Sequence, residues 1–451
     1  MRGFLLLCMC NLYIFAEAIT LNQALDLIKH NNLEIKSAEY DIQSASLSVD
    51  MADAQDYGQL NFIQNISRSN DAGNVFGFKL ASREATFGDF GFADFLSPPP
   101  GTTDILTVQP NDLNYPDARD FFQSKLIYEL PLYTGNKISA YQEMAKEMKN
   151  ISLLDKEAQI STKVYETRKS YFDMALLEGS LKNLQIILGN INRLETTTQE
   201  MITEGYAKKI DLLEVQSKKA NVARIITELE SNEELLYHYL SFLLNQDVKE
   251  IELPVYDLCE PSISAEEILH KSIDIKKAVT ALRIRESMLI AEESRYLPTV
   301  GAMAEIQTAD NSFLGDANDH KSYTVGLQLK WNLFSGGNDS ASIQKAQVEK
   351  LKMQSQTELA KQGIALKVKE IQTKIKTAES KIKNLNIELR LAREIYENYE
   401  GRYKEQLSSM SDVIIKQSEW LEKVLQLLQA ENERNTQIFA LERLALIQGD
   451  N

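Results

Sequence analysis

The strongest constraint on the fold is an internal repeat, because two segments in each half of the chain align with one spacing. Residues 130–135 (LPLYTG) align with 331–336 (WNLFSG), and residues 210–212 (IDL) align with 411–413 (SDV). Both spacings are 201 residues (331 − 130 and 411 − 210), so the stretch between the segments has the same length in each half. The sequence therefore predicts two copies of one structural unit.

A second spacing reveals an insertion in the first half. Residues 33–38 align with 273–278 at a spacing of 240 (273 − 33), which exceeds the first spacing by 39 (240 − 201). The extra residues lie between about 70 and 118, where glycine and phenylalanine are frequent and Pro98, Pro99 and Pro100 follow. Glycine and proline interrupt regular structure, so this composition predicts a loop.

Apolar and polar residues alternate in two stretches of each half, as they do in β-strands. The clearest alternation covers residues 323–333, its repeat counterpart covers 122–132, and weaker partners cover 58–67 and 299–308. Each half should thus supply one β-hairpin, with strands of about 11 residues that suffice to cross a membrane when tilted. The predicted lipid-facing residues include Tyr323, Val325, Leu327, Leu329 and Trp331.

After each hairpin the pattern becomes helical for nearly seventy residues. In the second half the apolar positions alternate spacings of four and three, a period of 3.5 that predicts left-handed supercoiling. Each long helix is expected to end near Gly205 or Gln406, and a second helix follows. The stripe consists of Ile364, Val368, Ile371, Ile375, Ala378, Ile382, Leu385, Leu389, Ala392, Tyr396, Tyr399 and Tyr403.

The start of the chain has the pattern of an export signal. Arg2 precedes an apolar run that ends at Ala16, and residues 16–18 (AEA) provide a small-residue cleavage site. Cys8 and Cys10 follow the large residues Leu7 and Met9, which does not fit a lipid-attachment signal. Cleavage after Ala18 would leave Cys259 as the only cysteine, which excludes an intrachain disulfide and predicts a buried or inert thiol.

These patterns define the expected domains. Residues 1–18 form the signal peptide, and residues 252–264 link the two repeats. The first repeat, residues 19–251, contains a helix (20–56), a hairpin (58–133) with the insertion (70–118), and helices within 136–245. The second repeat, residues 265–451, contains a helix (265–296), a hairpin (298–334) and helices within 339–448.

Four strands from one chain are too few to close a barrel. An open edge in lipid leaves unpaired backbone groups that cost several kcal/mol each, so closure requires several chains. Two chains would supply eight strands around a filled interior, whereas three would supply twelve around a lumen. The predicted fold class is a mixed α/β membrane protein, internally duplicated. Long coiled-coil helices would join a trimeric, twelve-stranded transmembrane β-barrel, and the family resemblance described below implies that they form a long α-helical barrel.

Charge and motif content argue against other functional classes. The 65 acidic and 49 basic residues give a net charge of −16, which disfavours a nucleic-acid partner because phosphate binding requires a basic surface. His30, His238, His270 and His320 are scattered without metal-ligand spacing, and no phosphate-binding loop is present. We therefore expect no enzyme, and no catalytic, cofactor or metal site.

In order and spacing, these features resemble the TolC family of outer-membrane efflux proteins over essentially the whole chain after the signal peptide. The resemblance is carried by the duplicated plan together with several short motifs. These are Leu297-Pro298 before the third strand, residues 333–337 (LFSGG) with their copy 132–136 (LYTGN), and the helix tips 204–206 (EGY) and 403–406 (YKEQ), followed by Asp211 and Asp412.

The resemblance implies a homotrimeric exit duct of a tripartite efflux or type I secretion system. It would lie in the outer membrane of a Gram-negative bacterium, with a large periplasmic portion that meets a periplasmic adaptor protein and an inner-membrane transporter. The helix tips that would contact the adaptor are Gly205, Tyr206, Gln406 and Leu407. The insertion, at the far end of the first hairpin, is expected outside the cell. The sequence leaves the cargo open among drugs, metals and secreted protein, and the partner pump open as well.

The resemblance further implies a gate near the helix tips. In the family, tyrosine, arginine and aspartate hold the closed end, and aspartate rings narrow the pore. Carried onto this chain, the tyrosine is Tyr403, the aspartates are Asp211 and Asp412, and the position of the arginine is Ser408. A second ring aspartate falls on Ile415. The family's ion pair therefore cannot form here in the same way, and only one of the two acidic rings is present.

Two interpretations stay open at these positions. Lys208 and Lys209 lie beside Asp211 and are candidates for the missing cation, although lysines in this setting are commonly solvated. Asp412 begins a helix, where an acidic residue is also favoured simply as a cap and by the helix dipole.

A trimeric coiled-coil surface adhesin is the alternative from another class, since it also combines export, heptads and a barrel. Such proteins usually place one short barrel segment at the chain end, whereas these hairpins lie inside two repeated halves. The sequence therefore favours the channel.

Overall fold

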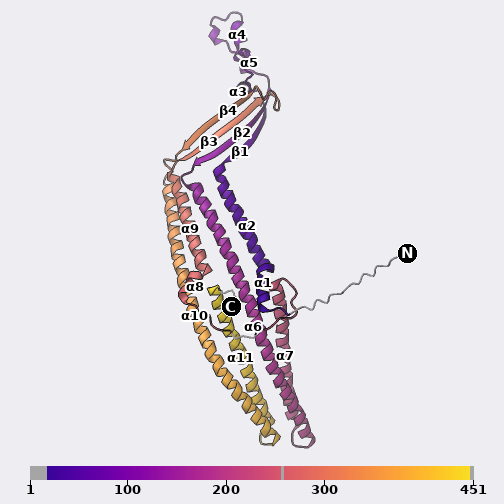
Figure 1. Cartoon of the computed structure of the whole chain (residues 1–451). Helices are drawn as coiled ribbons and strands as arrows, with labels where there is room; N and C mark the ends of the chain where they lie inside the picture. The colour runs from indigo at the N-terminus through magenta and orange to yellow at the C-terminus, as the bar shows by residue number, and fades with distance from the viewer. Residues whose placement is uncertain (1–17, 255–257, 447–451) are drawn as a thin grey trace, which may run out of the picture. The chain divides into compact units, whose positions relative to one another are not determined.

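The computed structural model describes residues 18–254 and 258–446, and its elements repeat as the sequence predicts (Figure 1). The first repeat contains α1 (Leu21–Asn31), α2 (Leu33–Asp53), β1 (Gln59–Ser69), β2 (Arg119–Tyr133), α6 (Lys137–Thr203) and α7 (Lys209–Leu244). The second contains α8 (Ala265–Lys271), α9 (Ile273–Glu293), β3 (Thr299–Asp310), β4 (Lys321–Lys330), α10 (Asn338–Lys404) and α11 (Met410–Ala445). Apart from Ala18, the predicted signal peptide lies outside the described residues.

The long helices repeat with the predicted spacing. Helices α6 and α10 each have 67 residues, and α7 and α11 each have 36. In both pairs the first residues are 201 positions apart (338 − 137 and 410 − 209). The two repeats therefore have equal lengths from the start of the first long helix to the end of the second.

The helices predicted over 20–56 and 265–296 are each interrupted, at Asn32 and at Ser272. Asn32 has an extended backbone (φ −62°, ψ 128°), and its side-chain oxygen accepts hydrogen bonds from the backbone N–H groups of Glu34 and Ile35. Asparagine and serine favour this capping role over a helix interior. The two breaks are 240 positions apart (272 − 32), which is the spacing of the repeat starts.

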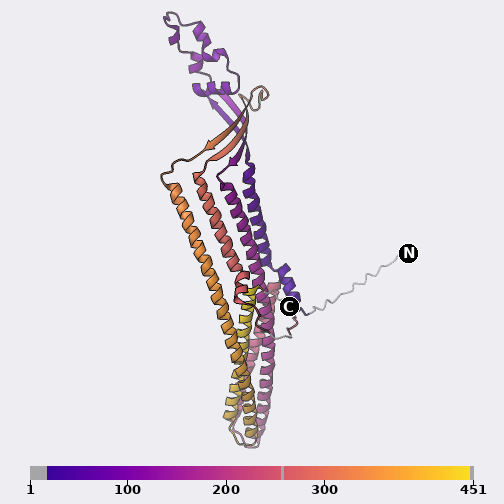
Figure 2. The ribbon, with the colours of Figure 1, turned by 60° about the vertical axis from the view of Figure 1, so that its left-hand side comes forward.

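One compact unit, residues 45–149 and 281–353, contains the sheet. Its four antiparallel strands lie in the order β1-β2-β3-β4, with β1 and β4 at the edges (Figure 2). The hairpin of each repeat is thus present, and the two are joined by pairing between β2 and β3. Strand β4 ends at Lys330, so Trp331 and Leu333, predicted as strand residues, lie beyond it.

The insertion is not the irregular loop that its composition predicts. It contains α3 (Ala72–Ala81), α4 (Phe92–Leu96) and α5 (Asn111–Asn114), with short 3₁₀ turns between them. The side chain of Asp71 caps α3 by accepting from the N–H of Asn74, and Phe78 of α3 stacks on Phe121 of β2 with ring centroids 4.1 Å apart. Capping and packing here outweigh the low helix propensity of glycine.

The other compact unit comprises the described residues of 1–44, 150–280 and 354–451. Two apolar clusters form its core, and both draw residues from the first and the second repeat. Of the twelve residues in the predicted stripe on α10, seven are buried and the others are half-buried. The stripe therefore faces the core, as its period predicts.

The cysteine between the repeats and the apolar character of the helices were also predicted from the sequence. Cys259 is exposed rather than buried, because it lies in the segment between the repeats. Within the described ranges, no helix combines the length and the apolar character needed to cross a bilayer.

Candidate functional site

One face of the sheet presents large apolar side chains that remain exposed in the single chain. Tyr323, Val325 and Leu327 on β4 are 80%, 74% and 76% exposed. The register continues this face across the sheet, since Tyr323 lies opposite Ile306, which lies opposite Leu126. Continuous apolar surface of this kind marks contact with a membrane or another protein. Trp331, predicted to join this face, lies just beyond β4, is 55% exposed and donates its indole N–H to the carbonyl of Tyr296 at 3.0 Å.

The opposite face of the sheet is polar and bridged by side chains. Asn65 donates to Gln123 at 3.1 Å, and Gln123 donates to Gln307 at 2.8 Å, which links three strands. Lys125 and Glu305 form an ion pair on this face, with Lys125 Nζ 3.9 Å from Glu305 Oε1. Because successive residues of a strand point to opposite sides, one sequence supplies both faces.

The turns that close the two helical hairpins have the same backbone geometry. Gly205 (φ 82°) and Gln406 (φ 61°) adopt the left-handed conformation. In each turn the next residue donates its N–H five positions back, at 2.7 Å from Tyr206 and 2.8 Å from Leu407, which is a Schellman motif. Tyr206 and Leu407 are 65% and 67% exposed. The turns thus hold one large apolar side chain each in solvent.

The gate residues implied by the family are close in sequence to these turns but differ in environment. Tyr403 is buried, and desolvation together with the nearby Asp211 carboxylate raises its pKa. Asp211 accepts from the backbone N–H of Lys208 at 2.8 Å. Ser408, at the position of the family arginine, donates to the carbonyl of Tyr399 at 3.2 Å. The Asp211 carboxylate thus acts on Tyr403 from the other helical hairpin, whereas the Ser408 hydroxyl is bonded to the Tyr399 carbonyl.

Asp412 is the third residue of α11 and completes a capping box with Ser409, the residue that precedes the helix. Its carboxylate accepts from the N–H of Ser409 at 3.1 Å and from its hydroxyl at 2.6 Å, while Asp412 donates its own N–H to that hydroxyl at 3.2 Å. These hydrogen bonds from Ser409 lower the pKa of Asp412, and the positive charges of Arg402 and Lys416 act in the same direction. In the single chain Asp412 is thus a helix cap, which is the simpler of the two interpretations left open by the sequence.

The positive charges that act on the Asp412 carboxylate were not among those predicted from the sequence. Lys208 and Lys209 are exposed beside Asp211, whereas Arg402 and Lys416 are the cations that act on Asp412. Arg402 lies over the Tyr399 ring at 5.5 Å. It precedes Ser408 by six residues, so a position-by-position alignment to the family arginine cannot find it.

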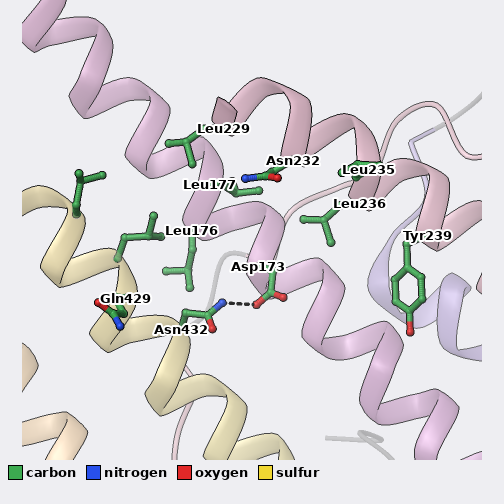
Figure 3. Close-up of a pocket in the computed structure, with 12 residues that line it drawn as sticks. Asp173, Leu176, Leu177, Leu229, Asn232, Leu235, Leu236, Tyr239, Gln429 and Asn432 are labelled. Carbon is green, nitrogen blue, oxygen red and sulfur yellow. Dashed lines mark hydrogen bonds between the residues drawn. The ribbon is translucent and has the colours of Figure 1, made fainter. Parts of the chain in front are cut away.

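A leucine-rich groove lies between α6, α7 and α11 (Figure 3). A hydrogen bond of 3.0 Å from Asn432 to Asp173 joins α11 to α6 beside it. Leu235 on α7, which lines the groove, is 63% exposed. The groove leaves apolar surface uncovered in one chain, which favours its burial by a partner.

Comparison with known proteins identifies the second repeat directly. Residues 265–445 match the model of a family described as outer membrane efflux protein. No curated protein matches the sequence.

Solved structures match almost the whole chain. Each of three covers 94% of this chain: CusC, crystallised to study transmembrane channel formation (TM-score 0.78, 15% identity, 91% of that chain covered), a membrane protein of Pseudomonas aeruginosa (0.78, 16%, 93%) and the CmeC outer membrane channel of Campylobacter jejuni (0.75, 15%, 85%). At these identities the likeness establishes the fold, including the first repeat that the family model does not cover.

Proposed function

We propose, from the match of residues 265–445 to an outer membrane efflux protein family and from the shared fold, that three copies of this chain form one channel through the outer membrane of a Gram-negative bacterium. The channel would continue as a helical tunnel into the periplasm. It would act as the exit duct of a tripartite efflux or type I secretion system.

The two-faced sheet is the observation that supports this function most. Its apolar face suits lipid and its hydrogen-bonded polar face suits a water-filled lumen, as in transmembrane barrels. Strands β1 and β4 each have one neighbour in the sheet of the single chain, and unpaired edges are not tolerated in lipid. Three sheets joined edge to edge would satisfy both edges and enclose a lumen.

Conductance of the purified protein in a planar lipid bilayer tests the function. We expect discrete, cation-selective openings, because the chain is acidic overall and a lumen would focus that charge. A plugged anchor of the adhesin kind would insert without conducting. Inserted protein that stays electrically silent under all applied voltages would therefore refute the channel.

We further propose that the turns at Gly205-Tyr206 and Gln406-Leu407 contact the periplasmic adaptor protein, which joins the channel to an inner-membrane transporter. Their exposed apolar side chains support a docking role. Leu407→Glu should abolish efflux without lowering the amount of assembled channel, since a buried charge without a partner is costly. Leu407→Met, the matched control, should preserve efflux. Unchanged drug sensitivity of cells with Leu407→Glu would count against the contact.

Asp412 is proposed to form a ring of three carboxylates at the periplasmic constriction. Three negative charges near one axis repel each other and attract multivalent cations. The repulsion would raise the pKa of Asp412, whereas the capping box lowers it in a single chain. Asp412→Asn should abolish block by periplasmic di- or trivalent cations and fold normally, because asparagine can still accept from Ser409. Glu405→Gln, the loss of an exposed charge nearby, is the control. Block that survives Asp412→Asn would leave Asp412 as a cap alone.

The insertion is proposed to lie outside the cell, since it leaves the sheet at the end where β1 finishes and β2 begins. Protease added to intact cells should cut within residues 82–110, between α3 and α5. Cutting near Gly205 instead, with the insertion intact, would reverse this orientation.

A further inference from the structure

Three side chains with metal-binding atoms meet at the end of the sheet from which the insertion leaves. Glu84 follows α3, Asp310 is the last residue of β3, and His320 directly precedes β4. Their ligand atoms all lie within 4.8 Å of one another. Because Glu84 and His320 are 236 positions apart (320 − 84), no local spacing in the sequence indicates the group, and the expectation of no metal site rested on local spacing.

His320 and Asp310 lie within ion-pair distance, and this contact is an ion pair only when the imidazole is protonated. His320 Nδ1 lies 3.3 Å from Asp310 Oδ2, yet this nitrogen is buried and makes no hydrogen bond. A buried polar atom without a partner costs about 1–3 kcal/mol, so its presence requires an explanation. Two ligands bound about 2.0–2.1 Å from one tetrahedral zinc ion lie about 3.4 Å apart, close to the observed separation.

Asp310 is oriented by the backbone around it. Its carboxylate accepts from the N–H groups of Asn311 at 2.6 Å and Asp316 at 2.7 Å, and its side chain is only 9% exposed. Hydrogen bonds of this kind hold ligating carboxylates in place. Gly315 passes so close that a Cβ there would lie 2.1 Å from the carboxylate. The β3–β4 loop is thus wrapped around a fixed Asp310.

We propose that Glu84, Asp310 and His320 bind one divalent transition-metal ion of the zinc class, which fastens the insertion to the β3–β4 hairpin. One imidazole nitrogen and two carboxylates are suitable zinc ligands, and water would take a fourth position. Glu84, with a side chain 30% exposed, provides the route of access. Arg119 forms an ion pair with Glu84 and therefore competes with the metal for this carboxylate.

Zinc binding by the full-length protein tests the site. The protein is purified in mild detergent without a histidine tag, and its metal content is measured after dialysis against micromolar Zn²⁺. We expect one zinc ion per chain in the wild type and its loss in His320→Gln. The matched control is His238→Gln, because His238 is an exposed histidine 3.8 Å from Glu234, and this variant should keep its zinc. Arg119→Gln should bind zinc with a lower Kd, since the competing cation is gone.

The structural consequence has its own measurement. Zinc should slow cleavage of the insertion by added protease in the wild type but not in His320→Gln. Variants are compared only when their particle mass and helical circular dichroism equal those of the wild type. Should His320→Gln fail that criterion, Glu84→Gln at the more exposed side of the site replaces it. Equal zinc content in the wild type and the folded variant, or no zinc retained by the wild type, overturns the proposal.

Discussion

The two helical hairpins, α6–α7 and α10–α11, share their lengths and turns but differ in what their seams contain. In the first hairpin, Glu195 accepts from Gln216 at 3.1 Å and pairs with Lys219 at 2.8 Å. The positions 201 residues later are Tyr396, Gln417 and Trp420 (195, 216 and 219 plus 201). There two of the three positions form an aromatic stack, with the ring centroids of Tyr396 and Trp420 5.5 Å apart, and the third position is Gln417.

The second seam is buried, whereas the first is solvated. Gln417 has no exposed surface, and neither its amide oxygen nor its amide nitrogen has a hydrogen-bond partner. The Tyr396 hydroxyl is buried without a partner as well. The two repeats therefore share helix length and turn geometry but differ in the side chains that fill their seams.

A buried ion pair shows the same divergence. Arg168 Nη2 of α6 lies 3.2 Å from Glu442 Oε1 of α11, and the two side chains are 9% and 11% exposed. The Arg168 guanidinium also lies over the Phe439 ring. The repeat-related positions are Lys369, which is exposed, and Ser241 (168 + 201 and 442 − 201). An ion pair is therefore present at only one of the two repeat-related places, and removing it should affect stability more than a change at Lys369 does.

Arg168→Met should have the largest effect on stability, a loss of about 3–5 kcal/mol, because it leaves the Glu442 charge buried without a partner. Lys369→Met, the repeat-related control, should change the free energy of unfolding by no more than about 0.5 kcal/mol. Denaturant titration followed by helical circular dichroism measures both. Equal losses in the free energy of unfolding for Arg168→Met and Lys369→Met would show that the buried ion pair does not distinguish the two repeats.

The same variant should be sensitive to pH with a definite sign. Desolvation raises the pKa of Glu442, and Arg168 opposes this rise. A raised pKa means that the contribution of the group to stability is present below its unfolded pKa and is lost as the pH rises through the folded value. Without Arg168 the pKa of Glu442 rises further, so the penalty of Arg168→Met should shrink on acidification from pH 8 to pH 5. A penalty that grows on acidification would contradict this assignment.

Gln417→Met should have an intermediate effect and should stabilise the protein by about 1–3 kcal/mol. The substitution removes two unsatisfied polar atoms and keeps a flexible side chain of similar size. Gln216→Met at the solvated counterpart loses an exposed hydrogen bond and should stay within about 0.5 kcal/mol of the wild type. A loss of stability in Gln417→Met would show that the Gln417 amide makes hydrogen bonds that contribute to stability.

The turns should give the smallest effect. Gln406→Gly should raise the stability by about 1 kcal/mol, since glycine adopts the left-handed conformation without the steric cost that other residues pay. Gly205→Gln, the reciprocal change, should lower it by a similar amount. Thermal unfolding of both variants measures the pair of shifts. Effects of the same sign would mean that the turn side chains contribute more than the backbone conformation does.

Long-range order in this chain was largely predictable because it rests on local periodicity and repeat spacing. The 3.5-residue stripe on α10, the two hairpins and the turns at Gly205 and Gln406 all follow from patterns within a few residues. The breaks at Asn32 and Ser272 were missed because capping competes with a continuous helical pattern there. The short helices of the insertion were missed because its packing on Phe121 overrides its composition.

The site residues divide in the same way. The repeat and the resemblance proposed Asp211, Asp412 and Leu407 as site residues, and the structure places all three at the turns between the long helices. Arg402 near Asp412, the unpaired Gln417 and the group of Glu84, Asp310 and His320 depend on which distant segments meet. Such contacts leave no periodic signal in one sequence.

Under the proposed function, four strands per chain close one channel only when three chains combine, and the mass of the native particle measures the number of chains. Full-length protein extracted in mild detergent should give a single species with three chains by native mass spectrometry, and the same species should insert into lipid bilayers and conduct. A folded single chain that inserts stably into the bilayer would contradict the account.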